Sequence, residues 1–161
     1  MLPQCLVGND IASQMVMSAS GPQSKPVTPP MKRLILKYWM TPTLHSIGKD
    51  QPLAVAHRLM KEQQIRHLPV LDGGKLVGLI SERDLYYLET VAGVNVETEP
   101  VEEGMTRDIY CASPDAPLRE VVLEMANRKY GCALVVEGKK AVGIFTTTDA
   151  MHLLAAYLQF A

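Results

Sequence analysis

Two stretches of the chain carry apolar residues at helical spacing. In each stretch they recur every three or four positions, as on one face of a helix: Leu53, Ala56, Leu59 and Met60, then Leu118, Val121, Val122, Met125 and Ala126. An Asp-x-Pro-Leu sequence opens both stretches, so we expect Asp50 and Asp115 near the helix caps and the prolines in the first turns. Each predicted helix therefore presents one apolar face to a core.

Two short apolar runs joined by a tight turn follow each predicted helix. The first pair is HLPVL and KLVGLI around Asp72-Gly73-Gly74, and the second is ALVV and AVGIF around Glu137-Gly138-Lys139. Glycines supply the positive φ angles that short hairpin loops need. A further helix follows each hairpin, opened by Ser81 or Thr146, and a short extended segment precedes the first helix. The predicted order of elements is β-α-β-β-α.

The two sets of elements are copies of one unit. Met40-Thr41 recurs as Met105-Thr106, and Val77-Gly78 recurs as Val142-Gly143, each 65 positions further along. From residue 38 onward this register needs no gap. Because 161 residues suffice for one compact domain or two small units, we expect two tandem repeats that share a core.

Segments outside the repeats differ in composition. Residues 18–30, SASGPQSKPVTPP, are rich in Ser and Pro and predict a flexible tether, and Met31 looks like a natural start. We therefore expect a flexible leader over residues 1–30, repeat 1 over 34–92, a connector over 93–104 and repeat 2 over 105–161.

Charge and composition limit the classes of function. Sixteen basic against seventeen acidic residues give a net charge of −1, which disfavours binding to nucleic acid or an anionic membrane through a global field. No stretch approaches the roughly 18 uninterrupted apolar residues of a membrane span. Three cysteines without paired spacing fit reduced thiols. We expect a cytoplasmic protein in which a local site holds any bound anion.

One motif lies between the last strand and the last helix of each copy. It reads Gly78-x-x-Ser81-x-x-Asp84 in the first copy and Gly143-x-x-Thr146-x-x-Asp149 in the second. Ser/Thr-x-x-Asp is a capping box, in which hydroxyl and carboxylate satisfy backbone N–H groups. A helix N-terminus also favours phosphate, and a carboxylate can accept two hydrogen bonds from a ribose diol. The glycine permits close approach of a backbone or a flat ring. Capping and ligand binding can coexist.

These motifs resemble those of the cystathionine β-synthase (CBS) domain family over roughly residues 34–160. The resemblance rests on Met40-Thr41-Pro42, Met105-Thr106, residues 65–72 and the stretches ending at Asp84 and Asp149. It implies an α/β fold of two repeats that pack through their three-stranded sheets into one pseudo-twofold module with two clefts. It also implies a non-enzymatic regulatory module that binds AMP, ADP, ATP or a related adenosyl ligand and requires no cofactor.

The resemblance also assigns roles by position. Asp84 and Asp149 would hold ribose hydroxyls. Phosphate would be contacted by Ser81 and Thr146, with Arg83 or Thr148 nearby, and by Arg66 and His67. The adenine pocket would be lined by Ile47, Leu68, Pro69 and Ile80, or by Ala112, Ala133, Leu134 and Phe145. Because Arg66-His67 becomes Gly131-Cys132 in the second copy, one cleft should attract phosphate more strongly. Which aspartate shares a cleft with Arg66 stays open.

Other candidate chemistry has weaker support. The histidines, His45, His57, His67 and His152, show no metal-ligand spacing, so we predict no metal site. No Cys, Ser or Lys lies in a motif that would activate a nucleophile, so we predict no catalytic residue. Two rival functions remain: a ligand-free structural or protein-interaction module in which both motifs are only caps, and a binder of NAD, S-adenosylmethionine or nucleic acid.

The C-terminal stretch, AMHLLAAYLQFA, is apolar on nearly all sides of a helix. Exposed apolar patches of this size usually mark an interface, and residues 85–88 are similarly apolar. The resemblance implies a homodimer built through the last helix of each repeat, and an effector protein would be a further partner in trans. The alternative is that the chain end folds back over its own sheet.

Overall fold

The computed structural model describes residues 34–42, 44–138 and 140–158. The predicted leader over residues 1–30 lies outside the described residues, as do the last three residues. Repeat 1 contains β1 (Ile47–Gly48), α1 (Leu53–Gln63), β2 (His67–Asp72), β3 (Lys75–Ser81) and α2 (Glu82–Glu89). Repeat 2 contains β4 (Cys111–Ala112), α4 (Leu118–Arg128), β5 (Cys132–Glu137), β6 (Lys140–Thr146) and α5 (Thr147–Leu158). A 3-10 helix (Leu36–Tyr38) precedes repeat 1, and α3 (Val101–Gly104) precedes repeat 2.

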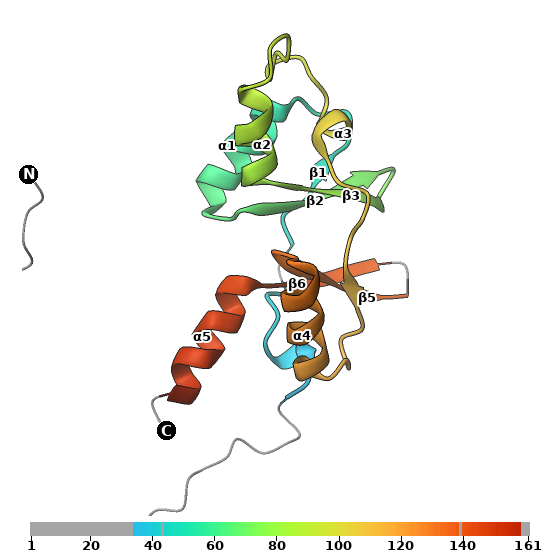
Figure 1. Ribbon diagram of the computed structural model, residues 1–161. Coiled ribbons are helices and arrows are strands. Elements are labelled where there is room, and N and C mark those ends of the chain that lie inside the picture. Colours follow the sequence, from blue (N-terminus) through green and yellow to red (C-terminus); the bar gives the residue numbers. More distant parts are fainter. Residues whose placement is uncertain (1–33, 43, 139, 159–161) are drawn as a thin grey trace, which may run out of the picture.

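Each repeat forms one three-stranded sheet, so the predicted β-α-β-β-α order and the α/β class are confirmed. The strand orders are β1-β2-β3 and β4-β5-β6, with a parallel first pair and an antiparallel hairpin in both. Gly73 and Gly74 form the first hairpin turn with φ of 54° and 82°, which a side chain would strain. The two sheets face each other, and the helices lie on the outer sides (Figure 1).

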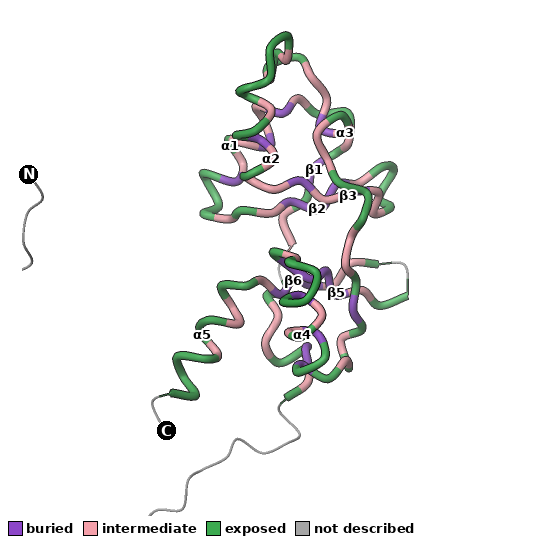
Figure 2. The backbone as a smooth tube through the Cα atoms, in the orientation of Figure 1, coloured by how far each residue is buried: buried purple, intermediate pink, exposed green. Residues whose placement is uncertain are grey.

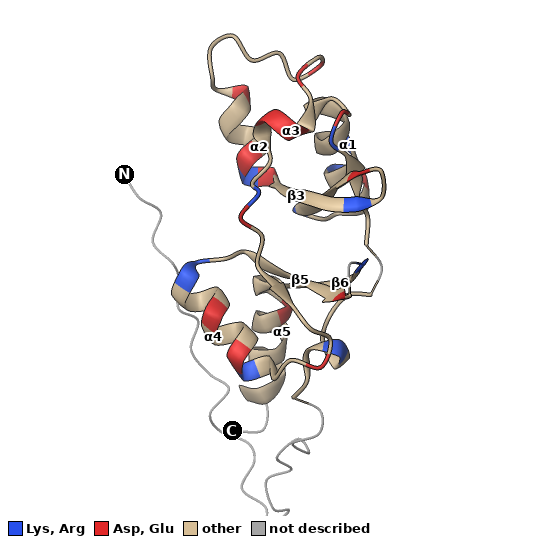
Figure 3. Cartoon of the chain, turned by 90° about the vertical axis from the view of Figure 1, so that its right-hand side faces the viewer, with Lys and Arg blue, Asp and Glu red and all other residues tan. Residues whose placement is uncertain are grey.

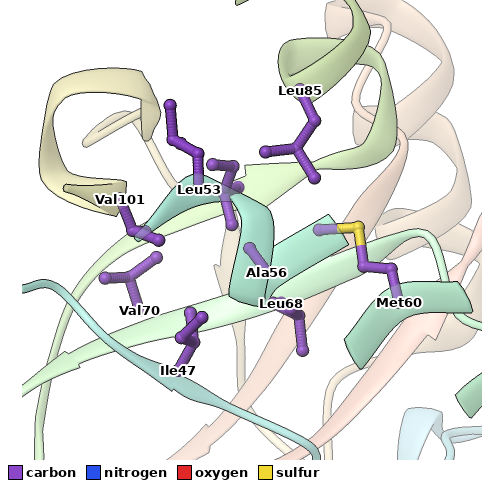
Figure 4. Packing of buried hydrophobic residues seen from close by; sticks show 9 residues of the cluster. Ile47, Leu53, Ala56, Met60, Leu68, Val70, Leu85 and Val101 are labelled. Carbon is purple, nitrogen blue, oxygen red and sulfur yellow. The ribbon is translucent and has the colours of Figure 1, made fainter. Parts of the chain in front are cut away.

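Most of the buried residues form one hydrophobic cluster in each repeat, between the sheet and its helices (Figure 2). In repeat 1, Leu53, Ala56 and Met60 of α1 pack against alternate residues of the strands (Figure 4). In repeat 2, Leu118, Val121 and Met125 of α4 do the same. The helical spacing seen in the sequence therefore does mark the core faces of both helices. No helix of the described chain is long and apolar enough to cross a membrane.

The segments before the two repeats are exchanged between them. The backbone around Leu36 bonds to the loop before α4, and Thr41 forms an antiparallel bridge with Ile144 of β6. Symmetrically, residues 96–101 bond to the start of α1, and Thr106 bridges to Leu79 of β3. The repeats are therefore joined through two short β bridges as well as through their facing sheets.

Asp50 and Asp115 lie near the starts of α1 and α4, as expected, but exchanged backbone rather than a side chain caps these helices. Pro52 and Pro117 are the N-caps of α1 and α4, and neither helix start has a side-chain cap. The N–H of Leu53 instead donates to the carbonyl of Glu99, and the N–H of Leu118 donates to the carbonyl of Leu34. Asp115 is left to pair with Lys37 at 2.7 Å. Exchanged backbone thus replaces side-chain capping.

Candidate functional site

The Ser/Thr-x-x-Asp motifs form the predicted capping boxes at the starts of α2 and α5. The Asp84 Oδ2 atom accepts from the backbone N–H of Ser81 at 2.9 Å and from the Ser81 hydroxyl at 2.6 Å. At α5 the Asp149 Oδ2 atom accepts both equivalent bonds from Thr146 at 2.7 Å. Neither Oδ1 atom has a hydrogen-bond partner within the described chain, so each half-buried carboxylate keeps one oxygen available.

A cleft lies at each of these helix N-termini. The Asp84 cleft, of about 860 Å³, is lined by residues 81–84, by Thr106, Asp108 and Tyr110, and by residues 129–132. The Asp149 cleft, of about 340 Å³, is lined by Thr41, Leu44 and His45, by residues 64–67, and by Thr146, Thr148, Asp149 and His152. Most of these positions correspond across the 65-residue offset, so the two clefts are pseudo-symmetric and each combines residues of both repeats.

The glycine of each motif accommodates the exchanged segment of the chain. A Cβ atom at Gly143 would lie 2.6 Å from Met40 Sδ and 3.0 Å from the carbonyl oxygen of Thr41. A Cβ atom at Gly78 would overlap the side chain of Met105. The motif glycines predicted that another group comes close to the backbone here. That group is a Met side chain at both glycines and also a backbone carbonyl at Gly143.

Arg66 joins the two repeats at the Asp149 cleft. One of its terminal guanidinium nitrogens donates to Thr148 Oγ1 at 2.6 Å. This contact places Arg66 beside the N-terminus of α5, where Asp149 lies. Arg66 and its neighbour His67 also line the Asp84 cleft.

The two clefts differ in their charged lining residues. The Asp84 cleft carries Arg83 and Lys129 together with the acidic Glu82 and Asp108, and acidic and basic segments lie side by side at the start of α2 (Figure 3). Lys129 ends α4 in the left-handed conformation, with φ of 61°. Within the described chain, Arg66 is the one Lys or Arg that lines the Asp149 cleft.

Titratable groups add to this difference. Three of the four histidines, His45, His67 and His152, converge on the Asp149 cleft, which their separate positions in the sequence did not reveal. Burial, and then the charge of Arg66, lowers the pKa of His67 below its ordinary 6.5. Burial raises the pKa of Cys132, which lines the Asp84 cleft, to about 12, so this thiol is uncharged. Among the described residues, no His, Cys, Asp and Glu cluster could hold a metal ion.

Among the described residues, none of the apolar residues expected around adenine is in the lining of either cleft. Six of these residues point to the helix side of the sheets and lie in the two hydrophobic clusters: Ile47, Leu68, Ile80, Ala112, Ala133 and Phe145. Successive strand residues face opposite sides of a sheet, so the neighbours of Ile80 and Phe145, which are Leu79 and Ile144, line the clefts. Pro69 and Leu134 are buried and pair in register with Leu79 and Ile144.

Two aromatic residues of the Asp84 cleft were not singled out from the sequence. Tyr110 and Tyr130 stack with ring centroids 5.5 Å apart and an interplanar angle of 10°. The repeat offset could have pointed to them, because Tyr110 corresponds to His45 and Tyr130 to Ile65, which line the other cleft. The Asp84 cleft therefore has these two aromatic residues in its lining.

Comparison with known proteins identifies the family. The CBS domain profile matches residues 35–88 and 99–156, and the chain belongs to this family. CBS domain pairs are regulatory ligand-binding modules. The CBS domain-containing protein YhcV of Bacillus subtilis is 27% identical over 114 residues, which are 71% of this chain and 81% of YhcV.

A longer relative and a solved structure show the same unit in other settings. Inosine-5′-monophosphate dehydrogenase of Methanocaldococcus jannaschii is 32% identical over 108 residues, which are 66% of this chain but only 21% of that enzyme. The chain thus spans about a fifth of that relative's length. The CBS domain pair of protein MJ0100, solved in complex with 5′-methylthioadenosine and S-adenosyl-L-methionine, is 26% identical with a TM-score of 0.69. The match covers 76% of this chain and 96% of that one.

Proposed function

We propose that this chain is a non-enzymatic regulatory module that binds adenine nucleotides, AMP, ADP or ATP, in the clefts between its repeats. One observation carries the proposal: in both repeats, a capping carboxylate at a helix N-terminus keeps one oxygen free beside a cleft. A carboxylate oxygen can accept hydrogen bonds from a ribose diol, while the helix N-terminus favours phosphate nearby.

Each cleft offers the other groups that a nucleotide requires. In the Asp84 cleft, Ser81, Arg83 and Lys129 would contact phosphate, and the stacked tyrosines provide an aromatic surface for a purine. In the Asp149 cleft, Thr146, Thr148 and Arg66 would contact phosphate. That the related MJ0100 domain pair binds two adenosyl ligands supports the purine ribose as the shared chemical element.

The proposed output is a change in how repeats or subunits pack. A ligand shifts a conformational equilibrium only through unequal affinity for the two states, and both clefts are built from both repeats. Closure of a cleft on a nucleotide would therefore move one repeat relative to the other. In a cytoplasmic setting this would report the adenine nucleotide balance to an effector protein in trans or to a second copy of the chain.

The last helices are the proposed homodimer surface. No residue of α5 is buried, and Met151, Leu154, Tyr157 and Leu158 are large and exposed. Only Ala150 and Leu153, near its start, pack against the core of repeat 2, and the rest of α5 leads away from that repeat (Figure 1). On α2, Tyr86 and Tyr87 are also exposed. A second copy would cover this apolar area.

A thermal-shift series tests the proposal. AMP, ADP, ATP, adenosine, NAD, S-adenosylmethionine and 5′-methylthioadenosine would each be added at millimolar concentration, where a ligand at 100 times its Kd stabilises by about 2.7 kcal/mol. The proposal predicts that adenine nucleotides raise the unfolding temperature. A shift with NAD or S-adenosylmethionine alone would reassign the ligand. If no compound stabilises the protein, the motifs are caps only and the chain is a structural or protein-interaction module.

A further inference from the structure

Among the residues that the structure describes, the two clefts have two lining residues in common, Arg66 and His67. The repeat offset gives these residues the counterparts Gly131 and Cys132, which line the Asp84 cleft alone. Gly131 has no side chain, and the buried Cys132 thiol is uncharged. The pseudo-twofold symmetry is thus broken at this point, where a single guanidinium lies between the two clefts.

Hydrogen bonds hold Arg66 to both capped helices. Its carbonyl oxygen accepts from the backbone N–H of Glu82, the first residue of α2, at 2.9 Å. Its guanidinium donates to Thr148 Oγ1 in the first turn of α5. The backbone is therefore fixed at the start of the Asp84 cleft while the side chain reaches the Asp149 cleft. The side chain is exposed, so it is free to exchange its Thr148 contact for another acceptor.

The clefts differ in their need for this cation. The Asp84 cleft has Arg83 and Lys129 in addition to Arg66, whereas no second Lys or Arg of the described chain lines the Asp149 cleft. A guanidinium binds phosphate through paired hydrogen bonds, which it can make fully to one phosphate at a time. Two phosphorylated ligands would therefore compete for Arg66.

We infer that Arg66 is a shared phosphate-binding residue that couples the clefts negatively. A phosphorylated ligand in the Asp84 cleft draws Arg66 away from Thr148 and weakens the binding of a second phosphorylated ligand in the Asp149 cleft. A nucleoside without phosphate does not engage the guanidinium, so it binds both clefts independently. This inference rests on the proposed nucleotide function and adds a rule for how occupancy of one cleft affects the other.

Calorimetric titration with ADP and with adenosine tests the coupling. Coupling free energies between sites usually correspond to about 5-fold to 150-fold in affinity. The reference is Asp84→Asn, in which the Asp84 cleft is weakened and ADP binds the Asp149 cleft first. In wild-type protein the second ADP should bind at least about fivefold more weakly than this reference ADP. Adenosine should bind the two clefts independently. In Arg66→Ala the ADP coupling should disappear, while Arg128→Ala, which removes the same charge from α4 outside both clefts, should keep it.

A gain-of-cation variant gives an independent measurement. Gly131→Arg places a second guanidinium at the position equivalent to Arg66, and the three atoms nearest its Cβ would belong to the side-chain ring of His67, with Nε2 at 2.8 Å, so this ring has to shift. This variant should bind two ADP molecules without coupling. Independent binding of ADP to the two clefts of wild-type protein would overturn the inference and leave the proposed function standing. Failure of both ADP and adenosine to bind would overturn both.

Discussion

Leu36 lies on the segment before β1 but packs into the core of repeat 2, and Val101 lies on the segment before β4 but packs into the core of repeat 1. Each residue therefore completes the core of the other repeat. The two residues are 65 positions apart, and both are fully buried. Because each hydrophobic cluster contains a side chain brought in by the exchanged segment, the two repeats should not fold separately. The clefts between them depend on the same exchange.

Leu36→Ala should therefore destabilise the whole protein. Burial of Leu36 in the second cluster predicts a loss of about 2–5 kcal/mol in the free energy of unfolding. Chemical denaturation followed by circular dichroism and by Trp39 fluorescence should show one transition, because both repeats unfold together. The control is Leu123→Ala on α4, where the side chain is 42% exposed and the loss should be small. Two separate transitions would contradict the coupled fold.

The motif glycines should differ in their tolerance of alanine. At Gly143 an added Cβ would press on the Thr41 carbonyl, which the β bridge holds in place, as well as on Met40. At Gly78 the three nearest atoms all belong to the flexible Met105 side chain. Overpacking lowers the free energy of unfolding by about 1–3 kcal/mol. The loss for Gly143→Ala should lie at the upper end of this range and the loss for Gly78→Ala at the lower end.

The comparison is made by denaturant titration of both glycine variants. Gly78→Ala combined with Met105→Ala should recover part of its loss through relief of the overlap, whereas Met40→Ala should not rescue Gly143→Ala to the same degree. Equal costs at the two glycines would mean that the Thr41 backbone adapts, and the bridge would then be weaker than its 2.8 and 3.0 Å hydrogen bonds indicate.

Local periodicity was sufficient to predict the β-α-β-β-α elements and their repetition, because both units reuse one hydrophobic pattern, but it did not indicate the 3-10 helix or α3. The helix faces, the hairpins and the Ser81 and Thr146 capping boxes all depend on residues within a few positions of each other. The exchange of the segments around Leu36 and Val101 is a long-range pairing with no local signature. The sequence therefore indicated that Asp50 and Asp115 lie near the helix starts, but not that backbone carbonyls of the exchanged segments cap these helices.

The candidate site also has a part that the sequence could predict and a part that it could not. The polar residues at the helix starts could be placed from the motif, since a capping box fixes their geometry. The apolar lining could not, because a displacement of one residue along a strand, as between Ile80 and Leu79, moves the side chain to the opposite face. The convergence of His45, His67 and His152 also depends on tertiary contacts between the repeats.

Stability should fall on mild acidification because of His67. Its pKa is lowered in the folded protein by burial and then by Arg66, so below the ordinary value of 6.5 the unfolded chain binds more protons than the folded chain. The contribution of His67 is therefore fully present above pH 6.5 and is lost as the pH falls toward the lowered pKa.

Denaturation of wild type and His67→Gln between pH 7.5 and 5.5 measures this contribution. The wild-type unfolding free energy should decrease more steeply with falling pH than that of His67→Gln. The control, His57→Gln, removes a histidine of α1 that pairs with Glu89 outside the clefts and should leave the His67 contribution in place. Parallel pH profiles for wild type and His67→Gln would show that His67 does not titrate differently on folding.

A charge on α5 should disrupt the proposed homodimer. Leu154 is 46% exposed near the middle of the apolar surface, so Leu154→Glu would place a carboxylate in the interface at little cost to the fold. Analytical ultracentrifugation should show a shift from dimer to monomer. Leu123→Glu, at a residue of similar exposure on α4, should leave the sedimentation unchanged. A wild-type protein that is monomeric at high micromolar concentration would refute the dimer.

The most direct test of the nucleotide site replaces both free carboxylates while keeping the caps. In Asp84→Asn/Asp149→Asn the amide oxygens can still accept from the backbone N–H groups, so the unfolding temperature should change little. Hydrogen bonds to a charged group are worth about 1.5–3 kcal/mol, so calorimetry should show ADP bound about tenfold or more weakly than by wild type. No heat of ADP binding to wild-type protein, or equal affinity in the double variant, would contradict the account.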